Sequence, residues 1–247
     1  MTLVLLVRHG LTAVTGSVLS GWTPGISLDD RGTAQAQALA TRLAPVPLDA
    51  IVCSPLDRCA QTAAAIGAGR PGVPFHTDDR VGECRYGDWT GKPLKKLAKE
   101  PLWRVVQQHP SGARFPGPDG ESMLEMQYRA VSAVRDWNFR LGPEATYVVC
   151  SHGDVIKAIV TDALGLHLDQ CQRVQADPCS LTVIRYTPLR PFVVRMNDTG
   201  GDVAGLIRHE GGRPGRRAES DGVVGGGAGQ GVTAAGAREA VTADAQG

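Results

Sequence analysis

Residues 3–10 read LVLLVRHG, and this stretch decides the fold class. Its first five residues are all apolar, without the alternation expected of a strand that has one face in water. A short run of this kind is typical of a strand buried on both faces, as in a parallel sheet covered by helices. The run stops at Arg8 and His9, so two chemically versatile side chains directly follow the predicted strand.

The same pattern returns twice further along the chain. Residues 50–53 and 146–150 are short apolar segments, and each is followed by a serine. A helical segment follows each of them, one running through Arg58 to Ile66 and the other over residues 154–164. Strands that alternate with helices predict an α/β domain, here three α/β/α layers around a largely parallel sheet.

The remaining predicted elements complete this domain. Leu124, Tyr128, Val131 and Val134 recur at helical spacing, so we expect them on one apolar, buried face of a long helix. Two late segments are rich in β-branched and apolar residues, which favours strands. The further elements are a helix capped by Asp29 or Asp30, short helices over 93–99 and 103–108, the long helix from about Glu121 to Arg140, and strands over 180–186 and 192–196.

Composition divides the chain into a single folded domain and a tail. Residues 1–199 have the apolar content of a globular domain, whereas residues 200–247 consist mainly of Gly, Ala, Arg and small polar residues. A segment with so few large apolar side chains buries too little surface to offset its ordering entropy. We therefore expect one domain over 1–199 and a disordered Gly/Ala-rich tail over 200–247.

Charge and cysteine content indicate which binding partners and which cellular compartment to expect. The formal net charge is +1, which gives no reason to expect nucleic acid or an anionic membrane as a partner. The amino terminus runs into the first strand without a secretory signal, and no segment is apolar for long enough to span a bilayer. The six cysteines form no CxxC pair or disulfide spacing, which predicts reduced thiols in the cytoplasm. The sequence does not predict an oligomeric state.

Two histidines and two arginines follow the predicted strands. In open α/β sheets, ligands bind at the carboxyl ends of the strands, so His9 and His152 should reach one pocket. Arg8 lies beside the first histidine, and Arg58 follows the second strand by about one helical turn. Because guanidinium groups present paired donors that match phosphate, these residues predict an oxyanion-binding clamp.

Five segments resemble, in the same order, the motifs of the phosphoglycerate mutase-like branch of the histidine phosphatase superfamily. The similarity spans roughly residues 3–185, nearly the whole predicted domain. The first segment alone is a weak signal, but five in order are specific. The segments are residues 6–12 (LVRHGLT), 54–63 (SPLDRCAQTA), Glu83 with 86–91 (YGDWTG), 120–122 (GES) and 149–153 (VCSHG).

This resemblance implies a phosphoglycerate mutase-like fold and a metal-independent mechanism that needs no cofactor. His9 is expected to attack the phosphorus and become transiently phosphorylated. Arg8, Arg58 and His152 are expected to hold the equatorial phosphoryl oxygens. Glu83 is expected to protonate the leaving oxygen and then to activate the water that hydrolyses the phosphohistidine.

Further substrate contacts are implied at the loop after the first strand. Ser20 and Gly21 resemble the pair whose backbone approaches the substrate in the mutases. Thr15 occupies the position where the family often has a phosphate-binding Asn, and Leu11 stands where Glu or Gln is usual. These two departures affect substrate preference more than the chemistry.

The resemblance therefore predicts a phosphatase that hydrolyses a small phosphorylated metabolite. The mutases carry a long insertion with paired arginines after the acid, whereas only about 37 residues separate Glu83 from Gly120 here, with no adjacent arginine pair. Excluding water is what a transferase must achieve, so the short segment favours hydrolysis. The alternatives are a phosphomutase and a phosphate-binding pseudoenzyme, and the substrate itself is not predicted.

A second candidate nucleophile is present in the sequence. Cys179 and Arg185 have the Cys-x5-Arg spacing of cysteine-dependent tyrosine phosphatases. That chemistry needs a loop of backbone amides around the phosphate, whereas residues 180–184 contain no glycine and are typical of a strand. We expect Cys179 to be uninvolved.

Overall fold

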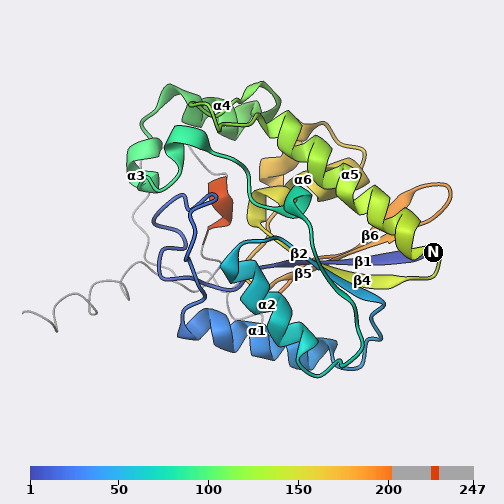
Figure 1. Cartoon of the computed structure of the whole chain (residues 1–247). Helices are drawn as coiled ribbons and strands as arrows, with labels where there is room; N and C mark the ends of the chain where they lie inside the picture. The colour runs from blue at the N-terminus through green and yellow to red at the C-terminus, as the bar shows by residue number, and fades with distance from the viewer. Residues whose placement is uncertain (202–223, 228–247) are drawn as a thin grey trace, which may run out of the picture.

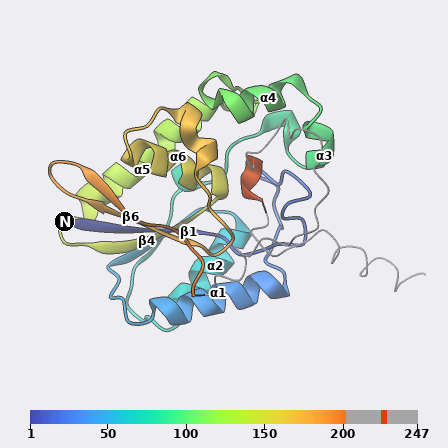
Figure 2. The same cartoon turned by 180° about the vertical axis from the view of Figure 1, so that it is seen from behind.

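The computed structural model describes residues 1–201 and 224–227 of the chain. A six-stranded sheet lies between two layers of helices, with α1 and α2 on one face and α5 and α6 on the other (Figure 1, Figure 2). The predicted three-layer α/β/α fold is confirmed. The strands are β1 (Thr2–Arg8), β2 (Ala50–Cys53), β3 (Phe75–Thr77), β4 (Thr146–Ser151), β5 (Leu181–Tyr186) and β6 (Pro191–Asp198); the helices are α1 (Asp30–Leu43), α2 (Asp57–Gly67), α3 (Leu94–Leu97), α4 (Pro101–Gln108), α5 (Met123–Leu141) and α6 (Gly153–Ala163).

The sheet order is β3-β2-β4-β1-β5-β6. The pairs β2–β3, β2–β4 and β1–β4 are parallel, whereas β5 runs antiparallel to both β1 and β6. The sheet is therefore mixed and mostly parallel. Strand β1 lies in its centre, which explains why residues 3–7 are all apolar.

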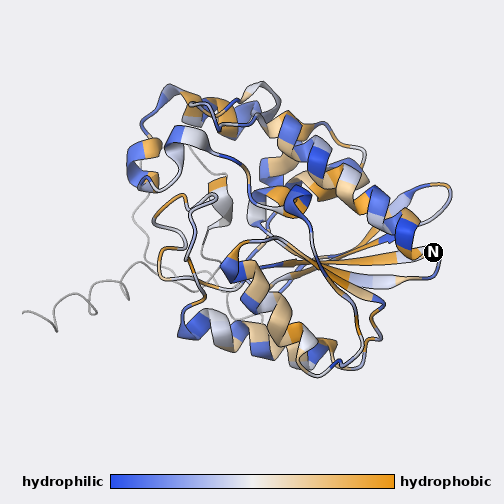
Figure 3. Ribbon diagram, viewed as in Figure 1, coloured by the Kyte–Doolittle hydropathy of each residue, from blue (hydrophilic) through white to orange (hydrophobic). Residues whose placement is uncertain are grey.

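Each face of the sheet has its own apolar core. The strands between the two cores are coloured mostly as hydrophobic in Figure 3. Leu5 and Val7 of β1 belong to the core under α1 and α2, and Val4 and Leu6 belong to the core under α5 and α6. This division follows from the strand geometry, since successive side chains point to opposite faces. Burying both faces fixes the register of β1, and with it the position of Arg8 at the end of the strand.

The structure differs from the sequence-based expectations in two details. The expected buried face of α5 is wrong in part, because Leu124 is 50% exposed and Tyr128 is 77% exposed. Val131 and Val134 of the expected face are buried, and Met123, Ala130 and Trp137 on the adjacent stripe are buried as well. Strand β3 was not predicted, since it contains only three residues at the edge of the sheet.

The expected disordered tail over 200–247 falls almost entirely outside the described residues. One part is described, a 3-10 turn over Val224–Gly226 (η6), where Val224 is 2% exposed. The tail thus contributes at least one buried apolar side chain. In the described part of the chain, no helix has the length and apolar character needed to cross a membrane.

Candidate active site

The strand register brings the chemically active residues to one edge of the sheet. Arg8 pairs with Ser151 across β1 and β4, and Cys53 pairs with Cys150 across β2 and β4. These strands are parallel, so the residue that follows each strand projects from the same edge. His9 and His152 consequently lie close together, with ring centroids 5.2 Å apart. The two histidines are thus neighbours, although only His9 lines the cavity.

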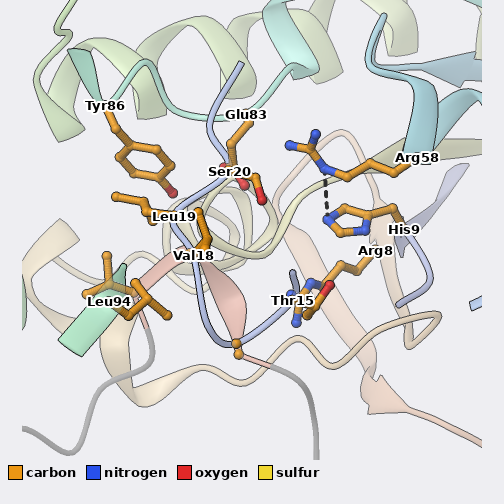
Figure 4. A pocket seen from close by; sticks show the side chains of 14 residues that line it. Arg8, His9, Thr15, Val18, Leu19, Ser20, Arg58, Glu83, Tyr86 and Leu94 are labelled. Atoms are coloured by element: carbon orange, nitrogen blue, oxygen red, sulfur yellow. Dashed lines mark hydrogen bonds between the residues drawn. The ribbon is translucent and has the colours of Figure 1, made fainter. Parts of the chain in front are cut away.

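A narrow cavity opens at this edge. Its wall contains Arg8, His9 and Arg58 on one side, and Val18, Leu19 and Leu94 on the other (Figure 4). One wall is therefore cationic and hydrogen-bonding, and the other is apolar. The remaining lining residues are Thr15, Gly16, Ser20, Glu83, Tyr86, Val224, Gly225 and Gly227.

The His9 ring is held in a single orientation by two neighbours. Its Nδ1 lies 2.7 Å from the carbonyl oxygen of Gly10, which only accepts, so Nδ1 carries the proton. Its Nε2 accepts a hydrogen bond of 3.3 Å from Arg58 Nε (Figure 4). Burial, together with the charges of Arg58 and Arg8, holds the pKa of His9 well below its ordinary value. At neutral pH the ring is uncharged, with the lone pair on Nε2.

The two arginines carry donors that no other described residue engages. Arg8 is 1% exposed and donates from Nη1 to the carbonyl of Ala176, while its Nε has no partner among the described residues. Arg58 is 2% exposed and donates from Nη2 to the carbonyl of Gly21, while its Nη1 has no partner within the same described set. Because buried charged donors are costly to leave unpaired, the arrangement fits an anionic ligand.

Glu83 is placed to move a proton. Its side chain lines the cavity, is almost fully buried, and accepts a 2.9 Å hydrogen bond from the amide of Cys84. Burial, followed by the charge of Asp154, raises the pKa of Glu83 to about 7. A carboxyl group with this pKa exchanges its proton at neutral pH, as a general acid and base must.

His152 lies behind the other residues and does not line the cavity. Its ring is fully buried, with Nε2 2.8 Å from Ser54 Oγ and Nδ1 3.3 Å from Arg58 Nη2. Burial and the charge of Arg58 hold the pKa of His152 well below its ordinary value. In this arrangement His152 positions Arg58, and its direct contact with a phosphoryl oxygen stays a prediction.

The three loop residues singled out in the sequence differ in position. Thr15 and Ser20 line the cavity. The hydroxyl of Thr15 accepts a 2.9 Å hydrogen bond from the amide of Thr12, which fixes the turn after β1. Gly21 does not line the cavity; its carbonyl holds Arg58, and its positive φ of 49° suits glycine.

Three contributors to the site were not identified from the sequence. Tyr86 lies within a family-like motif but was given no role; its hydroxyl donates to Asp154 Oδ2 at 2.8 Å. Asp154 itself is 1% exposed, and its position two residues after His152 was the available signal. For Val224, the only signal was a Val-Val pair inside a Gly-rich segment.

The described residues contain no group of three or more His, Cys, Asp or Glu side chains that could hold a metal ion. The charge that a metal would supply is already present in two guanidinium groups. The site thus combines an uncharged imidazole, a cationic anion-binding wall and a carboxyl group with a pKa near neutrality. This combination suits transfer of a phosphoryl group to the imidazole.

Comparisons with known proteins agree with this geometry. Residues 4–199 match the model of the histidine phosphatase superfamily (branch 1). The probable phosphoglycerate mutase GpmB of Yersinia pestis (strain Pestoides F) is 31% identical over 188 residues, which cover 75% of this chain and 86% of the relative.

Two solved structures share the fold closely. A mutant phosphoserine phosphatase from Entamoeba histolytica in complex with phosphoserine has a TM-score of 0.71 and 25% identity, covering 81% of this chain and 98% of that chain. YhfR from Bacillus stearothermophilus has a TM-score of 0.72 and 27% identity, covering 80% and 98% respectively.

Proposed function

The chain belongs to the histidine phosphatase superfamily, and from this we propose that it hydrolyses small phosphomonoesters through a phosphohistidine at His9. One observation carries the proposal. The uncharged imidazole of His9 lines the same cavity as Arg8, Arg58 and Glu83, which supports their proposed roles as nucleophile, anion clamp and acid. The reaction is expected to require no metal or organic cofactor.

The first step forms the covalent intermediate. The lone pair of His9 Nε2 attacks the phosphorus, and the bond from phosphorus to the ester oxygen breaks. The free N–H groups of Arg8 and Arg58 turn to the equatorial oxygens, whose charge they stabilise. Glu83 in its protonated form donates a proton to the leaving oxygen, and the alcohol departs.

The second step regenerates the enzyme. The carboxylate left on Glu83 takes a proton from a water molecule as that water attacks the phosphohistidine. The bond from phosphorus to Nε2 breaks, inorganic phosphate leaves, and Glu83 is again protonated. Because one carboxyl group serves as acid and then as base, a pKa of about 7 suits both steps.

The substrate is proposed to be a small phosphorylated metabolite. One structural relative is a phosphoserine phosphatase solved with phosphoserine, which supports this size class. A panel of phosphorylated metabolites that includes phosphoserine and 3-phosphoglycerate should identify the substrate. The six cysteines are all buried and unpaired, which supports placing the enzyme in a reducing cytoplasm.

A mutase is the rival function, and the relative named as a probable phosphoglycerate mutase favours testing it. The segment between Glu83 and Gly120 is short here, which favours access of water to the phosphohistidine. The test is to incubate the enzyme with 3-phosphoglycerate and a trace of 2,3-bisphosphoglycerate while following phosphorus NMR. Isomer formation faster than phosphate release would establish the mutase.

Release of phosphate from p-nitrophenyl phosphate tests the proposal independently of the natural substrate. The wild-type protein should hydrolyse this generic ester, and the His9→Ala variant should not. A wild-type protein that binds phosphate but turns over neither this ester nor any member of the panel would be a phosphate-binding pseudoenzyme.

A further inference from the structure

A short turn near the carboxyl terminus lies against the catalytic cavity. Val224, Gly225 and Gly227 line the same cavity as His9 and Arg8. Both views of the chain show this turn, coloured red, beside the loop that follows β1 and on the same side of the molecule as α3 (Figure 1, Figure 2). We call residues 224–227 the C-terminal turn. The segment is far from His9 in sequence yet forms part of the wall around it.

Apolar packing holds one end of the C-terminal turn. The Val224 side chain is 2% exposed and belongs to the core cluster that also contains Leu19 and Tyr86. Both of these residues line the cavity as well. Because the valine side chain is removed from water only when the turn packs here, this contact favours one position of the turn.

A buried carboxylate holds the next residue. The amide of Gly225 donates a 3.0 Å hydrogen bond to Asp154 Oδ2, the oxygen that also accepts from Tyr86. Asp154 is 1% exposed and forms an ion pair of 3.5 Å with Lys157. A hydrogen bond to a buried charged group is among the stronger ones in proteins. The C-terminal turn is therefore hydrogen-bonded to a buried side chain of the domain and does not merely lie on its surface.

The sequence of the C-terminal turn suits this position. Gly225 has a φ of +70°, which glycine adopts without strain. A Cβ atom there would approach Leu19 Cδ1 to 2.7 Å. Both the backbone angle and the space beside Leu19 thus select glycine at this residue.

The turn leaves little room in the cavity. The centre of a water-sized sphere has about 20 Å³ in which to move, which is room for about one water molecule. A phosphate group with an attached alcohol is several times larger. With the C-terminal turn in place, the clamp of Arg8 and Arg58 is formed, but its ligand has no space to enter.

We propose that the C-terminal turn is an autoinhibitory plug that occupies the substrate side of the cavity and must be displaced before a phosphate ester binds. When only a fraction of molecules is open, the apparent dissociation constant is the intrinsic constant divided by that fraction. Loosening the plug should therefore lower the KM and leave the kcat unchanged. The kinetic part of this inference rests on the proposed phosphatase function; the binding part does not.

Gly225→Pro in the full-length chain is the direct test. Proline has no amide hydrogen for Asp154, and its φ near −65° cannot match +70°. Gly231→Pro is the matched control, the same change six residues later and outside the described residues. We expect Gly225→Pro to lower the KM for p-nitrophenyl phosphate by about fivefold or more, with the kcat within about twofold and the control unchanged.

Val224→Ser is a second variant that removes the apolar contact without adding charge, and it should shift the KM in the same direction. Calorimetric titration with inorganic phosphate provides a readout that needs no turnover, and its Kd should fall in both variants. If neither the wild type nor the variants hydrolyse the ester but the phosphate Kd still falls in both variants, the plug proposal is supported and the phosphatase proposal fails. If the ester is hydrolysed and neither the KM nor the phosphate Kd falls, the plug is wrong. A raised KM would also overturn it, because the turn would then be part of the substrate site.

Discussion

His9 and Cys179 lie side by side at the same edge of the sheet, yet only one of them is suited to attack a phosphate. The register pairs Val7 with Leu181, and the amide of Cys179 donates to the carbonyl of Arg8 at 3.0 Å. Both side chains are buried, with 5% of His9 and 6% of Cys179 exposed. Proximity and burial therefore do not distinguish the two.

The same physical cause has opposite effects on the two groups. Burial disfavours the charged form of any side chain. For His9 the uncharged form is the nucleophile, so burial, aided by the charges of Arg58 and Arg8, keeps the imidazole reactive. For Cys179 the charged thiolate is the nucleophile, and burial raises its pKa to about 12, so the thiol stays protonated.

The partner arginines differ as well. Arg8 and Arg58 lie at the carboxyl end of β1, at the cavity. Arg185 pairs in register with Leu3, at the opposite end of β1, and lies over the ring of Phe192 at 5.3 Å. Most of the residues between Cys179 and Arg185 belong to the extended strand β5, so the thiol and the guanidinium lie at opposite ends of this segment. This separation supports the expectation that Cys179 is uninvolved.

The largest effect should come from the nucleophile. His9→Ala should reduce turnover of p-nitrophenyl phosphate by about 10⁴-fold or more, because no other group forms the covalent bond. Steady-state kinetics gives the loss, and thermal unfolding checks that the fold is retained. Activity within about tenfold of wild type would show that His9 is not the nucleophile.

A somewhat smaller loss is expected at the proton donor. Glu83→Gln should slow hydrolysis of an alkyl phosphate by about 10³-fold, since the alcohol must then leave without a proton. The raised pKa of about 7 means that the protonated form is lost as the pH rises through 7. The kcat/KM of wild type should therefore decline above pH 7, and the variant should lack this decline. If the kcat/KM of Glu83→Gln still declined above pH 7, another group would be the proton donor.

The next largest loss of activity is expected in the anion-binding clamp of Arg8 and Arg58. Arg58→Lys keeps the charge but loses the fork of donors, and we expect a reduction of about 10²-fold in kcat/KM. The matched change Arg185→Lys retains the same chemistry on the far end of β5 and should leave activity unaltered. Equal effects of the two substitutions on p-nitrophenyl phosphate kinetics would contradict the position assigned to the clamp.

Cys179→Ser should be nearly silent in the same assay. The thiol is protonated and takes no part in the proposed reaction, so the kcat is expected to stay within about twofold of wild type. A loss of several orders of magnitude would make Cys179 the nucleophile and reverse the comparison with His9.

The smallest effect is expected from metal removal. Two guanidinium groups supply the positive charge at the site, so prolonged treatment with EDTA should leave the kcat unchanged. Activity that falls after chelation and returns on adding a divalent cation would show that the clamp is incomplete without a metal.

The sequence predicts the fold and the chemical core of this protein because both depend on local patterns. An apolar strand followed by Arg8 and His9 is visible in one dimension, and parallel pairing then places His152 at the same edge. The packing around these residues was harder to predict from the sequence. Which stripe of α5 is buried depends on the neighbouring layer, so Leu124 was assigned to the core although it is half exposed.

Long-range partners were the hardest to predict. The amide of Gly225 bonds to Asp154 across 71 residues, and no periodicity connects the two. Composition alone predicts that a Gly-rich tail buries little, and Val224 departs from that expectation through a single contact. The state of Cys179 likewise depends on burial, which spacing in the sequence does not reveal.

The most direct test of the account is to identify the residue that carries the phosphoryl group during turnover. Glu83→Gln should slow hydrolysis of the intermediate, so this variant is mixed with p-nitrophenyl phosphate, quenched in alkali and digested. Mass spectrometry should find a phosphoryl group on the peptide that contains His9, stable in alkali and lost in acid. A phosphoryl group on Cys179, or sustained turnover with no phosphorylated peptide, would contradict the account.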